Sequence, residues 1–492
     1  MKPIKLSKLL YHLYDTPLHI DPEVTGIALD SRDVKPGNLF FAYPGTHLDG
    51  REFIKDAIKN GAVAVLSEVD SQFEPVHLKQ DVPILPVDQL NHRIGEIAAK
   101  FYHEPSKKLK VIGITGTNGK TSCSYFIAEA LQYIHIKCGV IGTLGSGLYG
   151  DITPGHLTTP DAISIQKTLA QFLEEGAQAV AMEVSSHSID QGRINGVQFE
   201  VGVFTNLTQD HLDYHVTMEA YGAVKKKLFE NSLSKYTVIN ADDNFGKYIL
   251  KDLSNENMFS YSLSPPLEEA KNSIYADKVQ LNIHGMRANV ITPWGQGEIY
   301  TKLIGEFNLS NILATLTSLC LLEIPFDVAL QAVNHLSPVP GRMQMLGGGD
   351  HPLIVVDYSH TPDALEKALV ALRSHCEGKL YCLFGCGGDR DKTKRPLMAK
   401  IAEQYADQVM LTDDNPRTED PAQIVEDIMQ GFTDPTKIII QHDRSKAIRD
   451  IIQYAKVSDC VLIAGKGAET YQQVGTTKIP FSDIEKVMES LN

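Results

Sequence analysis

One short segment limits the possible folds of this chain more than any other, the run Gly116-Thr117-Asn118-Gly119-Lys120-Thr121-Ser122. An apolar run at 109–114, too short for a helix, precedes it, and a stretch with helical apolar spacing at 122–133 follows it. This order predicts a strand, a glycine loop and a helix, where backbone amides and a helix N-terminus bind phosphate. Lys120 would add a full positive charge and Thr121 a Mg²⁺ ligand, so we predict an ATP-binding loop.

The glycine spacing of this loop departs from the widespread motif. Gly119 follows Gly116 after only two residues, whereas the usual motif places four residues between its first two glycines. A glycine turn that caps a helix is the alternative interpretation. The strand before the loop and the lysine after its second glycine favour the phosphate loop.

Three groups of alternating strands and helices predict three α/β domains, which fits a length of 492 residues. The first group, in a predicted domain 1–106, has apolar runs at 26–29, 39–42, 62–66 and 82–85. The second, in a predicted central domain 107–338, has runs at 109–114, 179–182, 201–204 and 237–240, which indicate a parallel sheet covered on both faces. The third, in a predicted Rossmann-like domain 339–492, has runs at 353–356, 379–383, 409–411, 438–440 and 461–464.

Composition argues against several functional classes. The formal net charge of -15 disfavours nucleic acid as a partner, because that binding depends on clustered Lys and Arg. The seven cysteines lack paired metal-ligand spacing, so we expect reduced thiols in a cytoplasmic protein. No apolar run approaches the roughly 18 residues of a membrane span, so we expect no membrane insertion.

Two polar residues follow predicted strands of the central domain. Glu183 comes directly after the run 179–182, and His211 lies a few residues after the run 201–204. Taken singly, each would be a solvated or hydrogen-bonded residue without a site. Because the carboxyl ends of parallel strands line the ligand crevice, we predict that both serve the metal and phosphate groups.

The lysine run at 225–227 contains one residue of interest. Tyr221, Lys225 and Leu228 share one helical stripe, whereas Lys226 and Lys227 point elsewhere. A solvated helix face is the ordinary interpretation of such a run. We predict instead that Lys225 faces inward, where desolvation favours its neutral amine. Such an amine could react with carbon dioxide to give a carbamate, an anionic metal ligand.

Several motifs together resemble one family over essentially the whole chain. They lie at 115–122, 182–187, 206–215, 305–311 and 356–362. The chain resembles the Mur ligases, ATP-dependent amide-forming enzymes of peptidoglycan synthesis. The resemblance implies the substrates UDP-N-acetylmuramoyl-L-alanyl-D-glutamate, meso-diaminopimelate and ATP, with Mg²⁺ as cofactor. We also expect a monomer.

The resemblance implies roles at the ATP and metal sites. Lys120, Glu183, His211 and Lys225 would be catalytic, and Thr121, Glu183, His211 and carbamoylated Lys225 would hold Mg²⁺. The implied ATP contacts are Gly116, Thr117, Asn118, Gly119, Lys120, Thr121, Ser122, Asn308, Asn311, Arg342, Asp357, Tyr358 and His360.

It also implies a site for the UDP-linked substrate. The implied residues are Leu29, Ser31, Thr46, His47, Leu48, Thr158, Thr159, Ser185, Gln191 and Arg193. One departure lies next to them, because position 157 is Leu157, where relatives commonly carry asparagine. Thr158 and Thr159 keep the family pattern.

The resemblance further implies a set of residues that hold the added amino acid, Arg390, Asp414, Asn415, Pro416, Arg417, Gly465 and Glu469. The planar guanidinium of Arg417 can clamp a carboxylate, and meso-diaminopimelate has a distal carboxylate that lysine lacks. A turn with a surface arginine is the alternative. Lysine-adding members generally lack this arginine. The segment Ala468-Glu469-Thr470 departs from the family pattern, although the glutamate is kept.

Three rival functions stay open. A lysine-adding ligase is disfavoured by Arg417, and a folylpolyglutamate synthetase by the full first domain. A non-catalytic nucleotide-binding regulator should lack either the metal residues or the third-domain motifs, and both are present.

Overall fold

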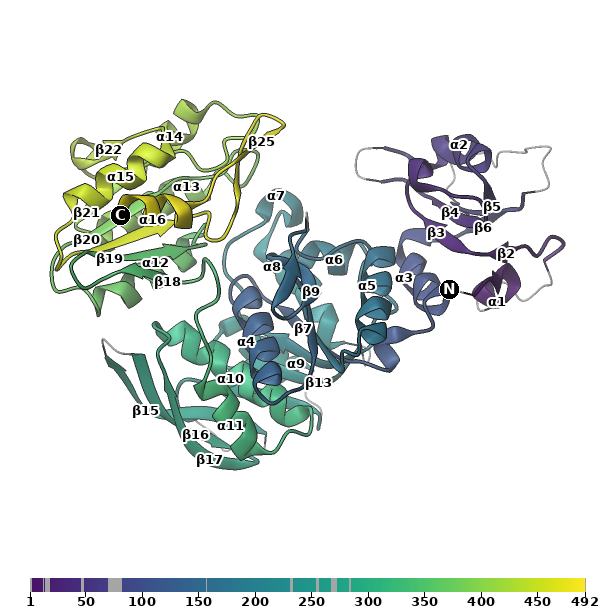
Figure 1. The fold of residues 1–492 in the computed structure, drawn as a ribbon, viewed down its shortest axis with the longest axis horizontal. Coiled ribbons are helices and arrows are strands. Elements are labelled where there is room, and N and C mark those ends of the chain that lie inside the picture. The colour runs from purple at the N-terminus through teal and green to yellow at the C-terminus, as the bar shows by residue number, and fades with distance from the viewer. Residues whose placement is uncertain are drawn as a thin grey trace. The chain divides into compact units, whose positions relative to one another are not determined.

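The computed structural model describes residues 2–11, 13, 18–45, 48–69, 82–155, 157–230, 233–253, 256–266, 272–282 and 285–491. The chain divides into two compact units. The first unit comprises 1–113, 136–200 and 230–234, and the second comprises 114–135, 201–229 and 235–492. Strands alternate with helices in both, so the predicted α/β class is confirmed (Figure 1). The boundaries at 106 and 338 remain predictions.

The first unit contains a small parallel sheet. Its strands follow the order β3 (Gly26–Ala28), β4 (Asn38–Ala42), β5 (Ala62–Glu68) and β6 (Ile84–Val87). Alternate residues of β4 point to opposite faces. Leu39 and Phe41 pack against α3 (Leu90–Phe101), while Phe40 packs against α2 (Ile54–Lys59). Both faces of this sheet are therefore covered, which fits the small α/β domain predicted here.

The first unit also contains one part of a larger sheet. The strand order in this part is β10 (Asp151–Thr153), β9 (Gly145–Leu148), β8 (Cys138–Gly142), β11 (Ala179–Glu183) and β7 (Lys110–Thr115). β8 and β11 are parallel, whereas β8, β9 and β10 pair antiparallel. The sequence prediction contained β7 and β11 but not the antiparallel strands.

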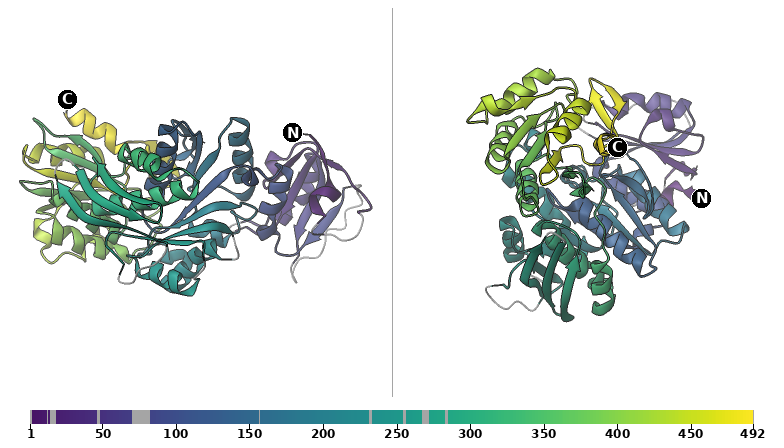
Figure 2. Two further views of the ribbon diagram at one scale, coloured as in Figure 1. Left: turned by 90° about the horizontal axis from the view of Figure 1, so that it is seen from below. Right: turned by 60° about the vertical axis from the view of Figure 1, so that its left-hand side comes forward.

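In the second unit, the end of β7 leads through the glycine loop into α4 (Lys120–Tyr133). The strand order here is β7, β12 (Phe199–Phe204), β13 (Ser234–Asn240), β14 (Met258–Ser262), β15 (Ser273–Asn282), β16 (Gly285–Thr292) and β17 (Gly295–Thr301). β13, β14 and β15 are parallel, but β15, β16 and β17 form an antiparallel ribbon (Figure 2). The predicted parallel sheet is therefore mixed at this edge.

The C-terminal sheet of the second unit has the order β18 (Gln344–Gly347), β19 (Leu353–Asp357), β23 (Cys460–Ala464), β20 (Leu380–Phe384), β21 (Gln408–Leu411) and β22 (Ile439–Ile440). All neighbours after β18 are parallel. One face packs against α12 (Pro362–Arg373), α13 (Lys394–Tyr405) and α14 (Pro421–Met429), and the other against α15 (Arg444–Tyr454) and α16 (Asp483–Leu491). This arrangement confirms the predicted Rossmann-like layers.

Candidate active site

The glycine loop adopts a conformation that requires its glycines. Gly116 has φ +147°, and a Cβ there would lie 1.9 Å from Thr205 Oγ1. Gly119 has φ +88°, and a Cβ there would lie 2.7 Å from Asn311 Oδ1. Such φ values favour glycine, so both positions exclude larger residues. The predicted strand, loop and helix are confirmed, and the short spacing between the two glycines is a feature of this turn.

Neighbouring backbone and side chains hold the loop. Asn118 N donates to Asn206 Oδ1 at 2.9 Å, and Thr205 Oγ1 donates to Asn118 O at 2.6 Å. Thr117 Oγ1 donates to Thr208 O at 3.1 Å and accepts from Thr208 N at 3.0 Å. The loop is thereby fixed to the segment after β12, on which His211 also lies.

Two lysines converge on one carbonyl of the loop. Lys120 Nζ donates to Gly116 O at 2.8 Å and to Thr117 O at 2.8 Å. Lys225 Nζ donates to the same Gly116 O at 2.9 Å. Both ammonium groups therefore lie within hydrogen-bond distance of one oxygen, and the charge of Lys120 disfavours the charged form of Lys225.

Lys225 faces inward, as its helical stripe predicts. It lies on α8 (Met218–Lys226), is 1% exposed, and has its Nζ 4.5 Å from the centroid of the Tyr221 ring. Burial, reinforced by the charge of Lys120, holds the pKa of Lys225 well below its usual value. Lys226 instead pairs with Asp252 at 2.6 Å. The run therefore contains one desolvated amine.

Several residues predicted to contact ATP surround the loop. Asn308 and Asn311 are buried on α10 (Glu306–Leu321). Asn311 Oδ1 accepts from Cys123 Sγ at 3.4 Å, next to Gly119. From the C-terminal part, Arg342 Nη2 donates to Thr121 Oγ1 at 3.0 Å, and its guanidinium lies 4.1 Å from the Tyr358 ring centroid. The structure thus brings Asn311, Thr121 and Arg342 to one loop.

Asp357 accepts hydrogen bonds that hold neighbouring segments in place. Its Oδ1 accepts from Met343 N at 2.6 Å, its Oδ2 accepts from Ser359 Oγ, and its carbonyl accepts from Gly465 N at 3.0 Å. Asp357 therefore fixes the ends of β19 and β23, where a pocket opens.

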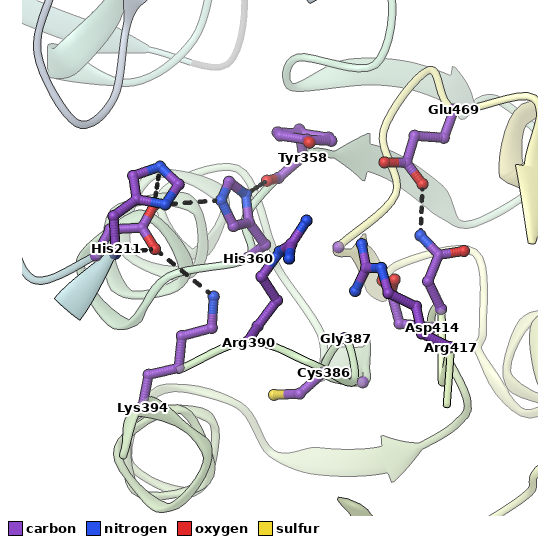
Figure 3. Close-up of a pocket in the computed structure, with 14 residues that line it drawn as sticks. His211, Tyr358, His360, Cys386, Gly387, Arg390, Lys394, Asp414, Arg417 and Glu469 are labelled. Carbon is purple, nitrogen blue, oxygen red and sulfur yellow. Dashed lines mark hydrogen bonds and ion pairs between the residues drawn. The ribbon is translucent and has the colours of Figure 1, made fainter. Parts of the chain in front are cut away.

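This pocket lies at the carboxyl ends of parallel strands β19, β20, β21 and β23 (Figure 3). It encloses about 520 Å³ of empty space, part of it open to solvent. Its lining residues are Asp210, His211, Tyr358, His360, Gly385, Cys386, Gly387, Arg390, Lys394, Asp414, Asn415, Arg417, Gly465 and Glu469. Most residues predicted for the added amino acid are thus brought together, and Tyr358 and His360 join them. Pro416 is not among the lining residues, and its carbonyl lies beside Gly388.

The backbone of Arg417 is held in an unusual conformation. Arg417 has φ +50°, its N donates to Gln473 O at 3.1 Å, and its carbonyl accepts from Gly475 N at 2.7 Å. These bonds tie it to β24 (Tyr471–Val474) and the turn after it. Arg417 Nη1 donates to Gly388 O at 2.7 Å. Hydrogen bonds therefore hold both the backbone and the guanidinium of Arg417, and they fix the guanidinium at the pocket.

A buried carboxylate in the pocket lining was not among the predicted residues. Asp210 Oδ2 lies 3.4 Å from His211 Nε2 and 3.6 Å from His360 Nε2, and Asp210 Oδ1 lies 3.9 Å from Lys394 Nζ (Figure 3). Burial alone would raise the pKa of Asp210. The nearby imidazole of His360 and the charges of His211 and Lys394 outweigh burial and hold that pKa well below its usual value.

The sequence gives no direct signal for Asp210 or Lys394, because their pairing joins residues far apart in the chain. Cys386 also lines the pocket without having been predicted, and burial raises the pKa of its thiol to about 12, which disfavours the thiolate.

The first unit gathers a second set of predicted residues. Thr159 Oγ1 donates to Glu183 O at 2.9 Å and accepts from Ser185 N at 3.1 Å. Arg193 Nη1 donates to Thr159 O at 3.0 Å, and its Nε donates to Gln191 Oε1 at 2.9 Å. Thr159, Ser185, Gln191 and Arg193 therefore form one connected group.

The N-terminal sheet approaches this group. Burial raises the pKa of Tyr43, and the charge of Asp161 also raises it while that of Arg193 lowers it. Ser31 is buried and Leu48 is 68% exposed. Thr46 and His47 lie outside the described residues. Leu157 is 53% exposed, beside Thr158.

The donors predicted for Mg²⁺ have suitable chemistry. Glu183 is fully buried, and its Oε1 accepts from Thr143 N at 2.8 Å. A Cβ at Gly142 would lie 2.3 Å from that Oε1, so the carboxylate needs a glycine beside it. Oxygen ligands such as Thr121 Oγ1 and a carboxylate are what Mg²⁺ prefers. Because Glu183 belongs to the first unit and Thr121, His211 and Lys225 to the second, their convergence remains a prediction.

Comparison with known proteins gives consistent matches. Family models match three stretches, "Mur ligase family, catalytic domain" at 23–102, "Mur ligase middle domain" at 114–319 and "Mur ligase, glutamate ligase domain" at 341–467. The UDP-N-acetylmuramoyl-L-alanyl-D-glutamate--2,6-diaminopimelate ligase of Coxiella burnetii is 49% identical over 489 residues, covering 99% of this chain and 100% of that protein.

The ligase of the same name from Ectopseudomonas mendocina is 50% identical over 465 residues, 94% of each chain. A solved structure of a ligase with that name is 35% identical with a TM-score of 0.72, covering 100% of this chain and 99% of the other. Along the described part of the chain, no helix is long and apolar enough to cross a membrane.

Proposed function

This chain belongs to the Mur ligase family, and we propose that it adds meso-diaminopimelate to the D-glutamate γ-carboxylate of UDP-N-acetylmuramoyl-L-alanyl-D-glutamate. Its class is that of ATP-dependent amide-forming ligases. The observation that carries the choice of amino acid is the pocket in which Arg417 and Glu469 lie together. A guanidinium pairs with a distal carboxylate and a glutamate with an ammonium group, and meso-diaminopimelate carries both.

The proposed reaction has two steps. The γ-carboxylate takes the terminal phosphoryl group of ATP, which gives an acyl phosphate and ADP. The amine of meso-diaminopimelate then attacks the acyl carbon, and phosphate leaves from a tetrahedral intermediate. Lys120 would turn from the loop carbonyls to the phosphate oxygens, where its charge stabilises the transferred group.

Mg²⁺ is the proposed cofactor, with Thr121, Glu183, His211 and carbamoylated Lys225 as its ligands by family resemblance. When bound, Mg²⁺ neutralises charge that develops on phosphate oxygens. The buried amine of Lys225 is suited to carbamate formation because burial disfavours its ammonium form. We further propose a cytoplasmic location and a monomer.

Phosphate release by the purified protein tests this function. With ATP, Mg²⁺ and the UDP-linked dipeptide, we expect turnover with meso-diaminopimelate and little with lysine. Lys120→Ala should abolish ADP formation while circular dichroism stays unchanged. A folded Lys120→Ala protein with full turnover would contradict the role of the loop, and preference for lysine would contradict the choice of substrate.

A further inference from the structure

Lys466 lies directly behind the pocket wall, and neither the sequence prediction nor the pocket lining includes it. It follows Gly465 at the end of β23, and its side chain is 0% exposed. Its Nζ donates to Asn415 Oδ1 at 3.0 Å and to Glu469 Oε2 at 2.9 Å, and lies 5.7 Å from the Tyr471 ring centroid. A fully buried ammonium group is costly unless it is paired, so these contacts need an explanation.

The first consequence concerns the amide of Asn415. Asn415 Oδ1 accepts from Lys466 Nζ at 3.0 Å and from Gln473 N at 2.8 Å, while Asn415 Nδ2 donates to Glu469 Oε2 at 2.9 Å. Rotating the amide would place its NH₂ group against two donors. Lys466 therefore helps to fix which side of Asn415 offers an N–H to the pocket.

The second consequence concerns Glu469. Its Oε2 accepts from both Lys466 and Asn415, whereas its Oε1 has no partner among the described residues. The side chain is 22% exposed and lines the pocket. One carboxylate oxygen is thus used to hold the residue in place, and the other is left for a ligand (Figure 3).

The third consequence concerns the charge of the pocket. Three carboxylates line it, Asp210, Asp414 and Glu469, and three cationic side chains, Arg390, Lys394 and Arg417. Behind the wall, the buried pair of Arg444 and Asp483 at 2.7 Å adds no net charge. Lys466 therefore adds one positive charge beside a lining whose carboxylates and cations balance. Meso-diaminopimelate is neutral overall, whereas lysine carries one positive charge.

We propose that Lys466 is a positioning and specificity-determining residue, which orients Asn415 and Glu469 and disfavours amino acids with a net positive charge. This inference rests on the proposed function. The charge of a fixed buried cation discriminates between ligands mainly by repelling the wrong one.

Three variants test this role in the full-length protein. Lys466→Met removes the positive charge and the hydrogen-bond donors. Lys466→Gln removes the charge but keeps hydrogen-bond donors, and Lys466→Arg keeps the charge and the donors. Lys478→Met is a matched control, because Lys478 Nζ lies 4.1 Å from the same Tyr471 ring but Lys478 is exposed. KM and kcat would be measured for meso-diaminopimelate, lysine and ATP, with thermal unfolding as a check on folding.

For Lys466→Met we expect KM for meso-diaminopimelate to rise about tenfold or more, as for loss of a charged hydrogen bond. KM for ATP should not change, and the ratio of kcat/KM for meso-diaminopimelate over lysine should fall. Lys466→Gln should lose selectivity with a smaller rise in KM, and Lys466→Arg should keep the selectivity. Wild-type selectivity in Lys466→Gln would overturn the inference even if Lys466→Met failed to fold. A wild-type protein that prefers lysine would instead overturn the proposed function.

Discussion

Lys225 illustrates what a single side chain contributes at this site. Its amine is buried against the Tyr221 ring and shares Gly116 O with Lys120. If Lys225 acts as a carbamate, Lys225→Ala should lose most ligase activity, and short carboxylates such as acetate should restore part of it by supplying the missing oxygen ligands. Turnover would be measured with increasing acetate.

Lys227→Ala is the control for that measurement, because Lys227 belongs to the same run but is exposed. It should keep wild-type turnover at every acetate concentration. A Lys225→Ala protein that folds but gains nothing from acetate or formate would count against the carbamate.

Some residues of the site can be predicted from the sequence, and others cannot. Lys225 could be predicted because a helical stripe is local, and Gly116 and Gly119 because their motif is contiguous. Asp210 and Lys466 could not be predicted in this way. The partner Asn415 lies 51 positions from Lys466, and His360 and Lys394 come from the C-terminal part to meet Asp210. Only the fold brings such pairs together.

At the scale of elements, strands buried on both faces were predictable as continuous apolar runs, as in β20 and β23. The antiparallel ribbon of β15, β16 and β17 could not be predicted in this way. β17 has the sequence GQGEIYT, in which exposed and buried positions alternate and glycine and polar residues are frequent. A sequence of this kind is typical of a loop, so β17 is recognised as a strand only from its pairing with β16.

Packing of α13 and α14 depends on a buried arginine. Arg395 on α13 is 0% exposed and pairs with Glu419 at 3.0 Å and with Asp427 of α14 at 2.7 Å. Its Nη2 also donates to Gly387 O at 3.2 Å, at the pocket. The hydrogen bond from Arg395 is the main reason that the pKa of Glu419 falls from 4.5 to about 2.

This shift makes a prediction about pH. Because the folded pKa is lower than the unfolded one, Glu419 stabilises the protein fully above about pH 4.5, and this contribution is lost as the pH falls towards 2. Glu419→Gln should therefore lower the midpoint of thermal unfolding at pH 7, with a difference from wild type that shrinks on acidification. Glu489→Gln, which removes an exposed pair with Lys486, should change it little. A Glu419→Gln deficit that stays constant from pH 7 to pH 3 would contradict this origin.

At the scale of the whole molecule, side-chain contacts within the second unit join the glycine loop to the C-terminal part of the chain that carries the pocket. Asn118 Nδ2 donates to Asp363 Oδ2 at 3.1 Å, at the start of α12. Arg342 contacts Thr121, and Gln209 Nε2 donates to Thr393 Oγ1 at 3.0 Å. Nucleotide and amino acid would therefore bind to parts of the chain that share these contacts. Coupling between two ligands is reciprocal, so each should raise the affinity for the other by the same factor.

Asp363→Ala should weaken that coupling. Calorimetry would give the affinity for meso-diaminopimelate with and without ADP and Mg²⁺, and the affinity for ADP with and without meso-diaminopimelate. In the wild type we expect an equal gain in both orders, of about fivefold or more. Asp363→Ala should reduce the gain in both orders because it removes the partner of Asn118. Lys367→Ala removes the other partner of Asp363, at 2.9 Å, without touching the phosphate loop, and should keep the full gain. Equal gains in all three proteins would show that this contact does not couple the two ligands.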